Sequence, residues 1–160
     1  MSENKKRPYR LAVITASDKG YTGQRVDESG PLICQMAKKH GYDVVHAIIL
    51  PDDLALLAAE MKRICDENVA DLLLTTGGTG FAPRDCMPEA TQQIVEKLVP
   101  GIPEAMRAYS LTITNRAMLS RAVAGIRKKT LIVNLPGSPK SVKENLTAII
   151  DALKHGLDIL

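Results

Sequence analysis

A glycine-rich segment in the middle of the chain, LLLTTGGTGFAPRDC at residues 72–86, begins as an apolar run. Gly77, Gly78 and Gly80 remove the side chains that would keep a phosphate group away from backbone N–H groups. Thr79 adds a hydroxyl donor to the same loop. Because glycine loops also follow strands as plain turns, the glycines alone leave both a phosphate site and a turn open. The lysine of a P-loop, G-x-x-x-x-G-K-S/T, is missing, and the dinucleotide pattern G-x-G-x-x-G does not occur.

Acidic residues accompany this loop and indicate what would hold the phosphate. Asp85, five residues after the last glycine, offers a carboxylate that suits a Mg²⁺ ion bridging phosphate oxygens. Its alternative role is to cap the helix that begins near Pro88 or to interact with the dipole of that helix. Of the neighbours Asp52 and Asp53, one is expected to cap the next helix and the other to face the ligand. Arg84 contacts phosphate or pairs with a carboxylate, and the pairing is slightly favoured.

Short apolar segments alternate with helical segments along the chain and must position these residues. The predicted strands are Arg10–Thr15, Asp43–Leu50, Leu72–Thr76, Ala122–Arg127 and Thr130–Leu135. The predicted helices run from Pro31 to His40, onward from Leu54, onward from Pro88, from Ile102 to Ile113, and onward from Pro139. In the second helix, one apolar face is formed by Leu54, Leu57, Met61, Ile64 and Cys65. The alternation predicts an α/β fold, a three-layer α/β/α sandwich with a mostly parallel sheet.

In an open parallel sheet, ligands collect at the carboxyl ends of the strands, near the point where the strand order reverses. The loops expected at that edge are Ser17–Ser29, Pro51–Asp53, Gly77–Met87 and Pro136–Pro139. Each loop carries small, glycyl or acidic residues. The edge can therefore admit a bulky anion and also hold a metal ion.

Length and composition bound the class of protein. At 160 residues, with 45% hydrophobic and 24% charged residues, the chain is most simply one domain at 9–160 after a flexible tail at 1–8. Aromatic residues are 3%, and part of the +3 charge lies in Lys5, Lys6 and Arg7 of the tail, so no nucleic-acid partner is expected. The longest early apolar run is too short for a membrane span. Three cysteines without a CxxC pair favour a reduced, cytoplasmic protein.

The segment TTGGTGFAPRDCMPEAT, residues 75–91, resembles the signature of the molybdenum-cofactor biosynthesis domain. The resemblance covers nearly the whole chain and is strongest to the molybdopterin adenylyltransferase family (MogA/MoaB) and to homologous domains of bifunctional plant and animal proteins. It includes SDKGYTGQRVDESGP at 17–31, LPDD at 50–53, AMLSRAVAGIRKKTLIVNLPGSPKS at 117–141 and ALKHGL at 152–157. The MLSR segment and the LPGSPK turn favour the adenylyltransferase branch.

This resemblance implies an enzyme that joins molybdopterin to the AMP moiety of Mg-ATP and releases pyrophosphate. The two essential aspartates of the family match Asp52 and Asp85, which would act in catalysis and as ligands of Mg²⁺. The nucleotide- and phosphate-binding loop of the family matches Gly77, Gly78, Thr79 and Gly80. The pterin is expected beside Ser17, Asp18, Pro136, Gly137 and Ser138. The family also implies a cytosolic homotrimer and a molybdate-insertion protein as a partner, with no membrane involved.

Adenylyl transfer explains why the site needs no P-loop lysine. The attacked phosphorus is the α-phosphorus of ATP, and the attacking group is itself a phosphate, so the main task is to bring two anions together in line. Two alternatives stay open: a nucleotide pyrophosphatase of the competence-damage type, and a non-catalytic molybdopterin-binding protein. The presence of both Asp52 and Asp85 argues against the second.

Overall fold

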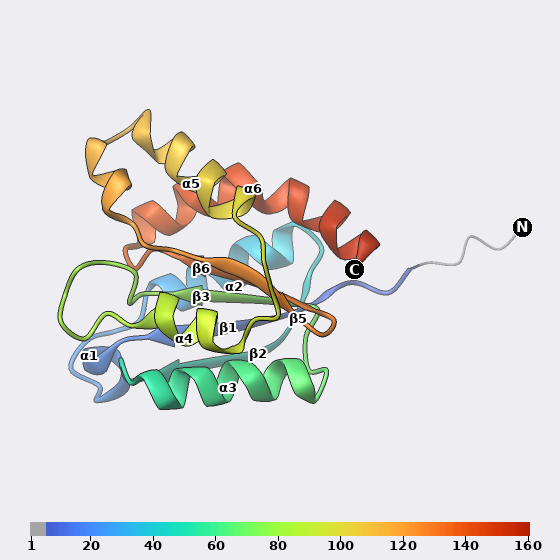
Figure 1. The fold of residues 1–160 in the computed structure, drawn as a ribbon, viewed down its shortest axis with the longest axis horizontal. Helices are drawn as coiled ribbons and strands as arrows, with labels where there is room; N and C mark the ends of the chain where they lie inside the picture. Colours follow the sequence, from blue (N-terminus) through green and yellow to red (C-terminus); the bar gives the residue numbers. More distant parts are fainter. Residues whose placement is uncertain (1–5) are drawn as a thin grey trace, which may run out of the picture.

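A six-stranded sheet with helices on both faces builds the protein, and the computed structural model describes residues 6–160 (Figure 1). The strands are β1 (Arg10–Ala16), β2 (Asp43–Leu50), β3 (Leu72–Thr76), β4 (Lys97–Leu98), β5 (Ala124–Arg127) and β6 (Thr130–Leu135). The helices are α1 (Asp18–Tyr21), α2 (Ser29–Lys39), α3 (Leu54–Asp66), α4 (Met87–Ile94), α5 (Gly101–Leu111), the 3₁₀ helix η1 (Asn115–Leu119) and α6 (Pro139–Ile159). Every strand and helix predicted from the sequence is therefore present, with small shifts at several ends.

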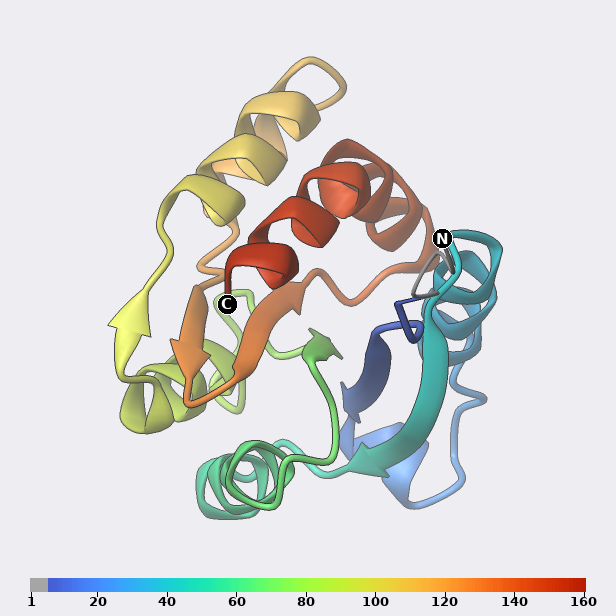
Figure 2. The same ribbon diagram turned by 90° about the vertical axis from the view of Figure 1, so that its right-hand side faces the viewer.

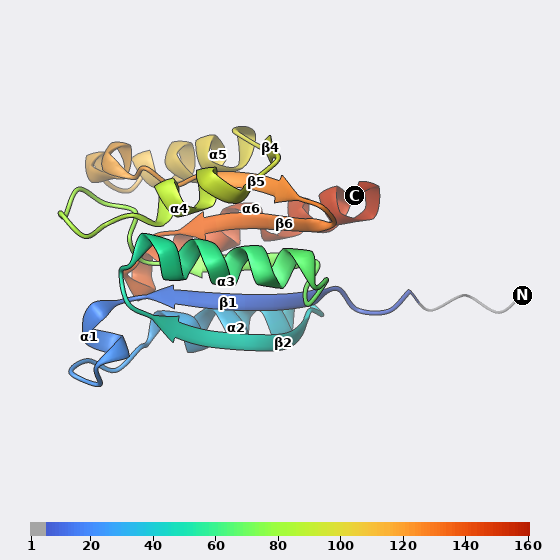
Figure 3. The same ribbon diagram turned by 60° about the horizontal axis from the view of Figure 1, so that its bottom comes forward.

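The strand order is β2-β1-β3-β6-β5-β4. The first four of these strands pair in parallel, whereas β5 is antiparallel to β6 and β4 is antiparallel to β5. The prediction of a three-layer, mostly parallel α/β/α sandwich is confirmed. Because β2 and β3 lie on opposite sides of β1, the strand order reverses between β1 and β3, and the parallel strands all end at one edge (Figure 3).

Alternate residues of the central strands point to opposite faces of the sheet and pack under different helices. Leu11 and Val13 of β1 belong to the core beneath α2, α5 and α6. Ala12 and Ile14 belong to the core beneath α3 and α4. Figure 2 shows these two groups of helices on either side of the sheet. Burying each such apolar side chain contributes about 1–3 kcal/mol, so both cores hold the strand ends firmly in place.

Several local features differ from the predictions. Leu54, expected on the buried face of α3, is 38% exposed because it is the first residue of that helix. The helices α2 and α5 each begin and end one or two residues earlier than predicted. The elements that were not predicted, α1, β4 and η1, contain two to five residues, too few for a periodic apolar pattern. Within residues 6–160, no helix combines the length and apolar character needed to cross a bilayer.

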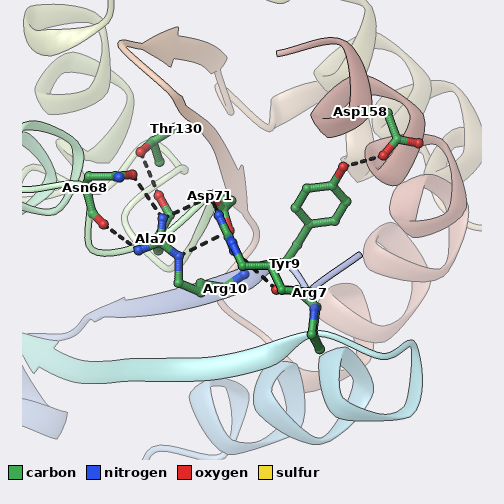
Figure 4. A network of polar contacts seen from close by, with 9 residues as sticks. Arg7, Tyr9, Arg10, Asn68, Ala70, Asp71, Thr130 and Asp158 are labelled. Carbon is green, nitrogen blue, oxygen red and sulfur yellow. Dashed lines mark hydrogen bonds and ion pairs between the residues drawn. The ribbon is translucent and has the colours of Figure 1, made fainter. Parts of the chain in front are cut away.

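Residues at the start of the described chain are bound to the opposite edge of the sheet from the predicted site (Figure 4). Arg7 donates from Nη1 to Asp71 Oδ2 at 2.8 Å, and the backbone N–H of Arg10 donates to the same oxygen at 2.8 Å. Lys6 and Tyr9 both contact Asp158 of α6. Lys6 and Arg7 of the predicted flexible tail therefore contact the domain, whereas residues 1–5 of that tail lie outside the described residues.

Replacing Asp71 with asparagine is expected to make stability less dependent on acid pH. Burial alone would raise the pKa of Asp71, but hydrogen bonds from Arg7 and Arg10 outweigh it and hold the pKa well below its usual range. Such a carboxylate contributes stability that is complete above its unfolded pKa of about 4 and is lost as the pH falls toward the folded pKa. At pH 7 the variant should lose roughly 2 kcal/mol, or about 4–8 °C in melting temperature. Thermal melts from pH 7 to pH 2 should show this gap closing, and a constant gap would contradict the assignment.

Candidate active site at the carboxyl edge of the sheet

A cavity of about 480 Å³ lies where the strand order reverses, among the loops that follow β1, β2, β3 and β6. The predicted site residues that line it are Ser17, Asp52, Gly77, Gly78, Asp85, Gly137 and Ser138. These residues come from four loops that are far apart in the sequence. The structure thus brings most of the predicted site together at the predicted edge.

The other predicted site residues do not line this cavity. Thr79, Gly80 and Pro136 line a second, smaller cavity of about 250 Å³ that borders α5, η1 and the start of α6. The neighbours Gly78 and Thr79 therefore face different cavities. Asp18 lines neither cavity and is bound to other loops of the site.

The glycine loop passes close to the end of β1. Gly77 has a φ of +89° and Gly78 a φ of +71°, both in the left-handed region that favours glycine. A Cβ on Gly77 would lie 2.4 Å from the carbonyl oxygen of Ala16, and a Cβ on Gly78 would lie 3.4 Å from Asp52 Oδ1. The fold itself therefore requires glycine at position 77, which supports the turn interpretation there. Phosphate binding by the loop stays a prediction.

The sequence left open which of Asp52 and Asp53 caps a helix and which faces the ligand. In the structure, the two residues have different surroundings. Asp53 Oδ1 accepts a hydrogen bond from Leu56 N at 2.9 Å and caps α3. Asp52 instead lines the larger cavity, and it is fixed there by a reciprocal pair of hydrogen bonds with Asp18. Asp18 N donates to Asp52 Oδ2 at 3.1 Å, and Asp52 N donates to Asp18 Oδ1 at 3.0 Å. The capping part of the prediction is confirmed.

Negative charge gathers at this end of the cavity. Burial raises the pKa of Asp52, and the charges of Asp18 and Asp85 raise it further. The pKa of Asp18 is lowered, first by its hydrogen bonds from Arg84 and then by the backbone N–H of Asp52. A cation placed between carboxylates in this way relieves their mutual repulsion.

Asp85 does not cap a helix, so the capping part of its alternative role is wrong. The residue at the N-cap position of α4 is Cys86, and its side chain makes no capping hydrogen bond. Asp85 Oδ2 accepts a hydrogen bond from Ala82 N at 3.0 Å and closes a turn inside the loop. A Cβ on Gly80 would lie 2.9 Å from the same Oδ2 atom, so the glycine leaves room for the carboxylate. The turn places Asp85 in the wall of the larger cavity.

The two carboxylates fit a hard divalent cation that takes its other ligands from elsewhere. Among residues 6–160, no hydrogen bond involves Asp52 Oδ1 or Asp85 Oδ1, so these oxygens are available as ligands. No group of three or more His, Cys, Asp or Glu residues in that range could hold a metal by itself. Mg²⁺ typically binds through one or two carboxylates together with substrate phosphates and water. The donor set therefore suits Mg²⁺ that arrives with a nucleotide.

Arg84 pairs with a carboxylate, as the sequence favoured. Its Nε donates to Asp18 Oδ2 at 2.7 Å, and its Nη2 donates to Asp18 Oδ1 at 3.1 Å. Because Asp18 also binds the backbone of Asp52, this pair connects the loops that follow β1, β2 and β3. The Arg84 side chain is 62% exposed and the Asp18 side chain 41%, so the ion pair contributes little to stability and its main effect is to join the loops.

Asp27 is among the residues of the cavity wall to which the sequence reasoning assigned no role. Asp27 lines the larger cavity, and its Oδ2 accepts a hydrogen bond from the Thr15 hydroxyl at 2.8 Å. Its Oδ1 accepts a hydrogen bond from Gly30 N at 3.0 Å, near the start of α2. The available signal was an aspartate three residues before a glycine at a helix start, which is typical of a capping interaction. Asp27 fixes the irregular segment between α1 and α2 against β1.

The chain is similar to known proteins over nearly its whole length. The family model described as "Probable molybdopterin binding domain" matches residues 12–155. The chain is 41% identical over 152 residues to molybdopterin adenylyltransferase of Helicobacter pylori (strain J99), covering 94% of this chain and 86% of that protein. It is 38% identical over 155 residues to molybdopterin adenylyltransferase of Escherichia coli (strain K12), covering 92% and 79%.

A solved structure agrees in fold as well as in sequence. The crystal structure of the molybdopterin biosynthesis enzyme MoaB from Thermus thermophilus superposes with a TM-score of 0.89 at 41% identity, covering 94% of this chain and 95% of that one. The family model and this superposition both span nearly the whole domain. The chain therefore belongs to the molybdopterin-binding domain family of molybdenum-cofactor biosynthesis proteins.

Proposed function

We propose that this protein is a molybdopterin adenylyltransferase, which transfers the AMP moiety of Mg-ATP to molybdopterin and releases pyrophosphate. The observation that carries the proposal is one cavity at the strand-order reversal, where Gly77 and Gly78 face the carboxylates of Asp52 and Asp85. The similarity to adenylyltransferases extends over more than nine tenths of the chain and so includes all the loops around this cavity.

The reaction exchanges one phosphoanhydride bond for another. A phosphate oxygen of molybdopterin attacks the α-phosphorus of ATP, and a new P–O–P bond forms. The bond between the α-phosphorus and the oxygen that bridges to the β-phosphate breaks, and that oxygen leaves with pyrophosphate. Since the attacking oxygen is already anionic, no general base is needed, and catalysis depends on positioning and on electrostatic stabilisation.

Each predicted group has a place in this scheme. Asp52 and Asp85 would hold Mg²⁺, which when bound neutralises charge on the phosphate oxygens. Gly78, which has no side chain, leaves the loop backbone open to a phosphate group at the cavity wall. The reciprocal hydrogen bonds between Asp18 and Asp52 keep the Asp52 carboxylate oriented without substrate. That preorganisation removes a reorganisation cost at the moment of reaction.

The two cavities would take different parts of the two substrates. The larger one offers Ser17, Gly137 and Ser138 to the pterin. Asp18 and Pro136, also expected beside the pterin, would act indirectly: Asp18 through Asp52 and Arg84, and Pro136 through its carbonyl, which accepts a hydrogen bond from the Thr76 hydroxyl. The glycine loop separates the cavities, with Thr79 and Gly80 on the smaller side. Phosphate groups of both substrates would then meet over this loop.

Pyrophosphate release should depend on molybdopterin if this proposal is right. Incubating the purified protein with Mg-ATP should give almost no pyrophosphate, and adding molybdopterin should start its release together with an adenylylated pterin. Equal nucleotide hydrolysis with and without the pterin would instead favour the pyrophosphatase alternative. Binding of molybdopterin without any pyrophosphate would favour a non-catalytic binding protein.

The same proposal includes a homotrimer that works in the cytoplasm and passes its product to a molybdate-insertion protein. Large apolar side chains between the end of α5 and η1 support self-association, because monomeric proteins rarely expose so many in one short segment. These side chains, each 43–62% exposed, are Tyr109, Leu111, Ile113, Met118 and Leu119. The mass measured by analytical ultracentrifugation should be three times that of the chain, and a monomer would contradict the trimer.

A further inference from the structure

Arg121, just after η1, joins the glycine loop to the segment that carries Asp85. Its backbone N–H donates to the carbonyl oxygen of Thr79 at 3.0 Å. Its side chain donates from Nε to the carbonyl oxygen of Gly80 at 2.8 Å and from Nη2 to the carbonyl oxygen of Asp85 at 3.1 Å. Arg121 lies in the MLSR segment that favoured the adenylyltransferase resemblance, although the sequence assigned it no role.

These contacts restrain a loop that is otherwise held at few points. At its base, Met87 N donates to the carbonyl oxygen of Gly78 at 3.1 Å. Inside it, Ala82 N donates to Asp85 Oδ2 at 3.0 Å. Beyond the base, Arg121 adds further contacts that join one arm of the loop to the other. A planar guanidinium can reach two acceptors at once in a fixed geometry, which a lysine ammonium cannot reproduce.

Arg121 is itself held in position by its surroundings. Its Nη1 contacts the carboxylate of Glu89 in the first turn of α4. On either side in the chain, the carbonyl oxygens of Ser120 and Ala122 accept hydrogen bonds from Arg107 Nη1 at 3.3 and 3.2 Å. The Arg121 side chain is 34% exposed but lines neither cavity. Arg121 therefore acts on the backbone of the glycine loop and does not border the space that substrates would fill.

We propose that Arg121 is a positioning residue for the adenylyl transfer, which holds the Asp85 carboxylate in the cavity by bonding to both arms of the glycine loop. The expected effect of Arg121 on the reaction rate rests on the proposed function. The effect of Arg121 on the glycine loop can be measured without substrate. Removing outer partners that orient metal ligands typically costs about 10–100-fold in activity or metal affinity. We expect Arg121→Ala to lower kcat by about that factor and to raise the Mg²⁺ concentration needed for half-maximal rate.

Arg127→Ala is the matched control. Arg127 also donates to a carboxylate, from Nε to Asp66 Oδ1 at 2.8 Å, and to a backbone carbonyl, from Nη1 to Ile94 O at 2.9 Å. It lies on β5, and its partners end α3 and α4, away from the carboxyl edge. The control should lose a similar amount of stability and keep its kcat and Mg²⁺ dependence.

Amide hydrogen exchange of the substrate-free protein tests the loop directly. In Arg121→Ala, the amides of Ala82 and Met87 should exchange faster than in the wild type, whereas in Arg127→Ala they should not. Arg121→Lys, which can keep one of the two side-chain contacts, should give intermediate exchange and rate, and it serves as the test if the alanine variant does not fold. Unchanged exchange at both amides, or equal losses of rate in the Arg121 and Arg127 variants, would overturn the inference. A wild-type protein that fails to release pyrophosphate would refute the function while the exchange result still decides the role of Arg121.

Discussion

The Asp85→Asn variant is expected to fold and bind molybdopterin but to transfer the adenylyl group about 10²–10³ times more slowly. Asparagine keeps the shape of the side chain, and its carbonyl oxygen can still accept the hydrogen bond from Ala82 N. What it loses is the negative charge that a divalent cation requires. Asp52→Asn should behave in the same way, because Asp52 lines the same cavity.

Asp53→Asn is the natural control for this experiment. Asp53 is adjacent to Asp52 in the chain but caps α3 and does not line the cavity. Asparagine is also a good N-cap, so the change should alter stability by less than the roughly 1 kcal/mol that losing a cap costs. Initial rates over a Mg²⁺ titration, with melting temperatures for all three variants, separate the two roles. Near-normal turnover in a folded Asp85→Asn protein would refute the metal-ligand assignment.

Gly77→Ala is expected to have the largest effect on stability among the loop substitutions, lowering the unfolding free energy by about 2–5 kcal/mol. The residue has a φ of +89°, and a new Cβ would lie 2.4 Å from the carbonyl oxygen of Ala16. That oxygen belongs to the backbone at the end of β1, so it cannot move aside as the end of a flexible side chain could. To relieve this close contact, the glycine loop must shift away from the strand, and this shift should also disturb the cavity.

Gly41→Ala separates the two causes of this effect. Gly41 also has a positive φ, +82°, but the nearest atom to its Cβ would be Lys154 Nζ at 3.7 Å, an ordinary contact. Gly41→Ala should therefore lose only the unfolding free energy that the positive φ costs, about 1 kcal/mol or somewhat more. Chemical denaturation of both variants gives the comparison. Equal losses of stability would mean that the loop does not pack against β1 as described.

The sequence predicted the architecture because its strongest signals coincide with the sheet. Leu72–Thr76 is an uninterrupted run of leucine and threonine. All of its residues are buried, and the strand pairs with β1 on one side and β6 on the other. The antiparallel edge was less predictable, since β4 is two exposed residues whose pairing with β5 depends on tertiary contacts. The helical turn of α1 was also hard to predict, because none of its residues is buried and so no apolar pattern marks it.

The site was predicted in its parts but not in its connections. Position after a strand was enough to bring Asp52, Asp85 and Gly137 to one cavity. It could not tell that Asp18 would turn away to bind Arg84, since the direction of a side chain in a four-residue helix depends on neighbouring loops. The role of Arg121 was hidden as well, because its partners are backbone carbonyls, which no residue pattern reveals.

The fate of the α-phosphate of ATP tests the central claim most directly. ATP labelled at that phosphate is incubated with Mg²⁺, molybdopterin and the protein, and the labelled products are separated and identified. The account predicts that the label enters an adenylylated pterin, with one pyrophosphate released for each label transferred, and that it remains in ATP when molybdopterin is omitted. Label recovered as free AMP in equal amounts with and without molybdopterin would contradict it.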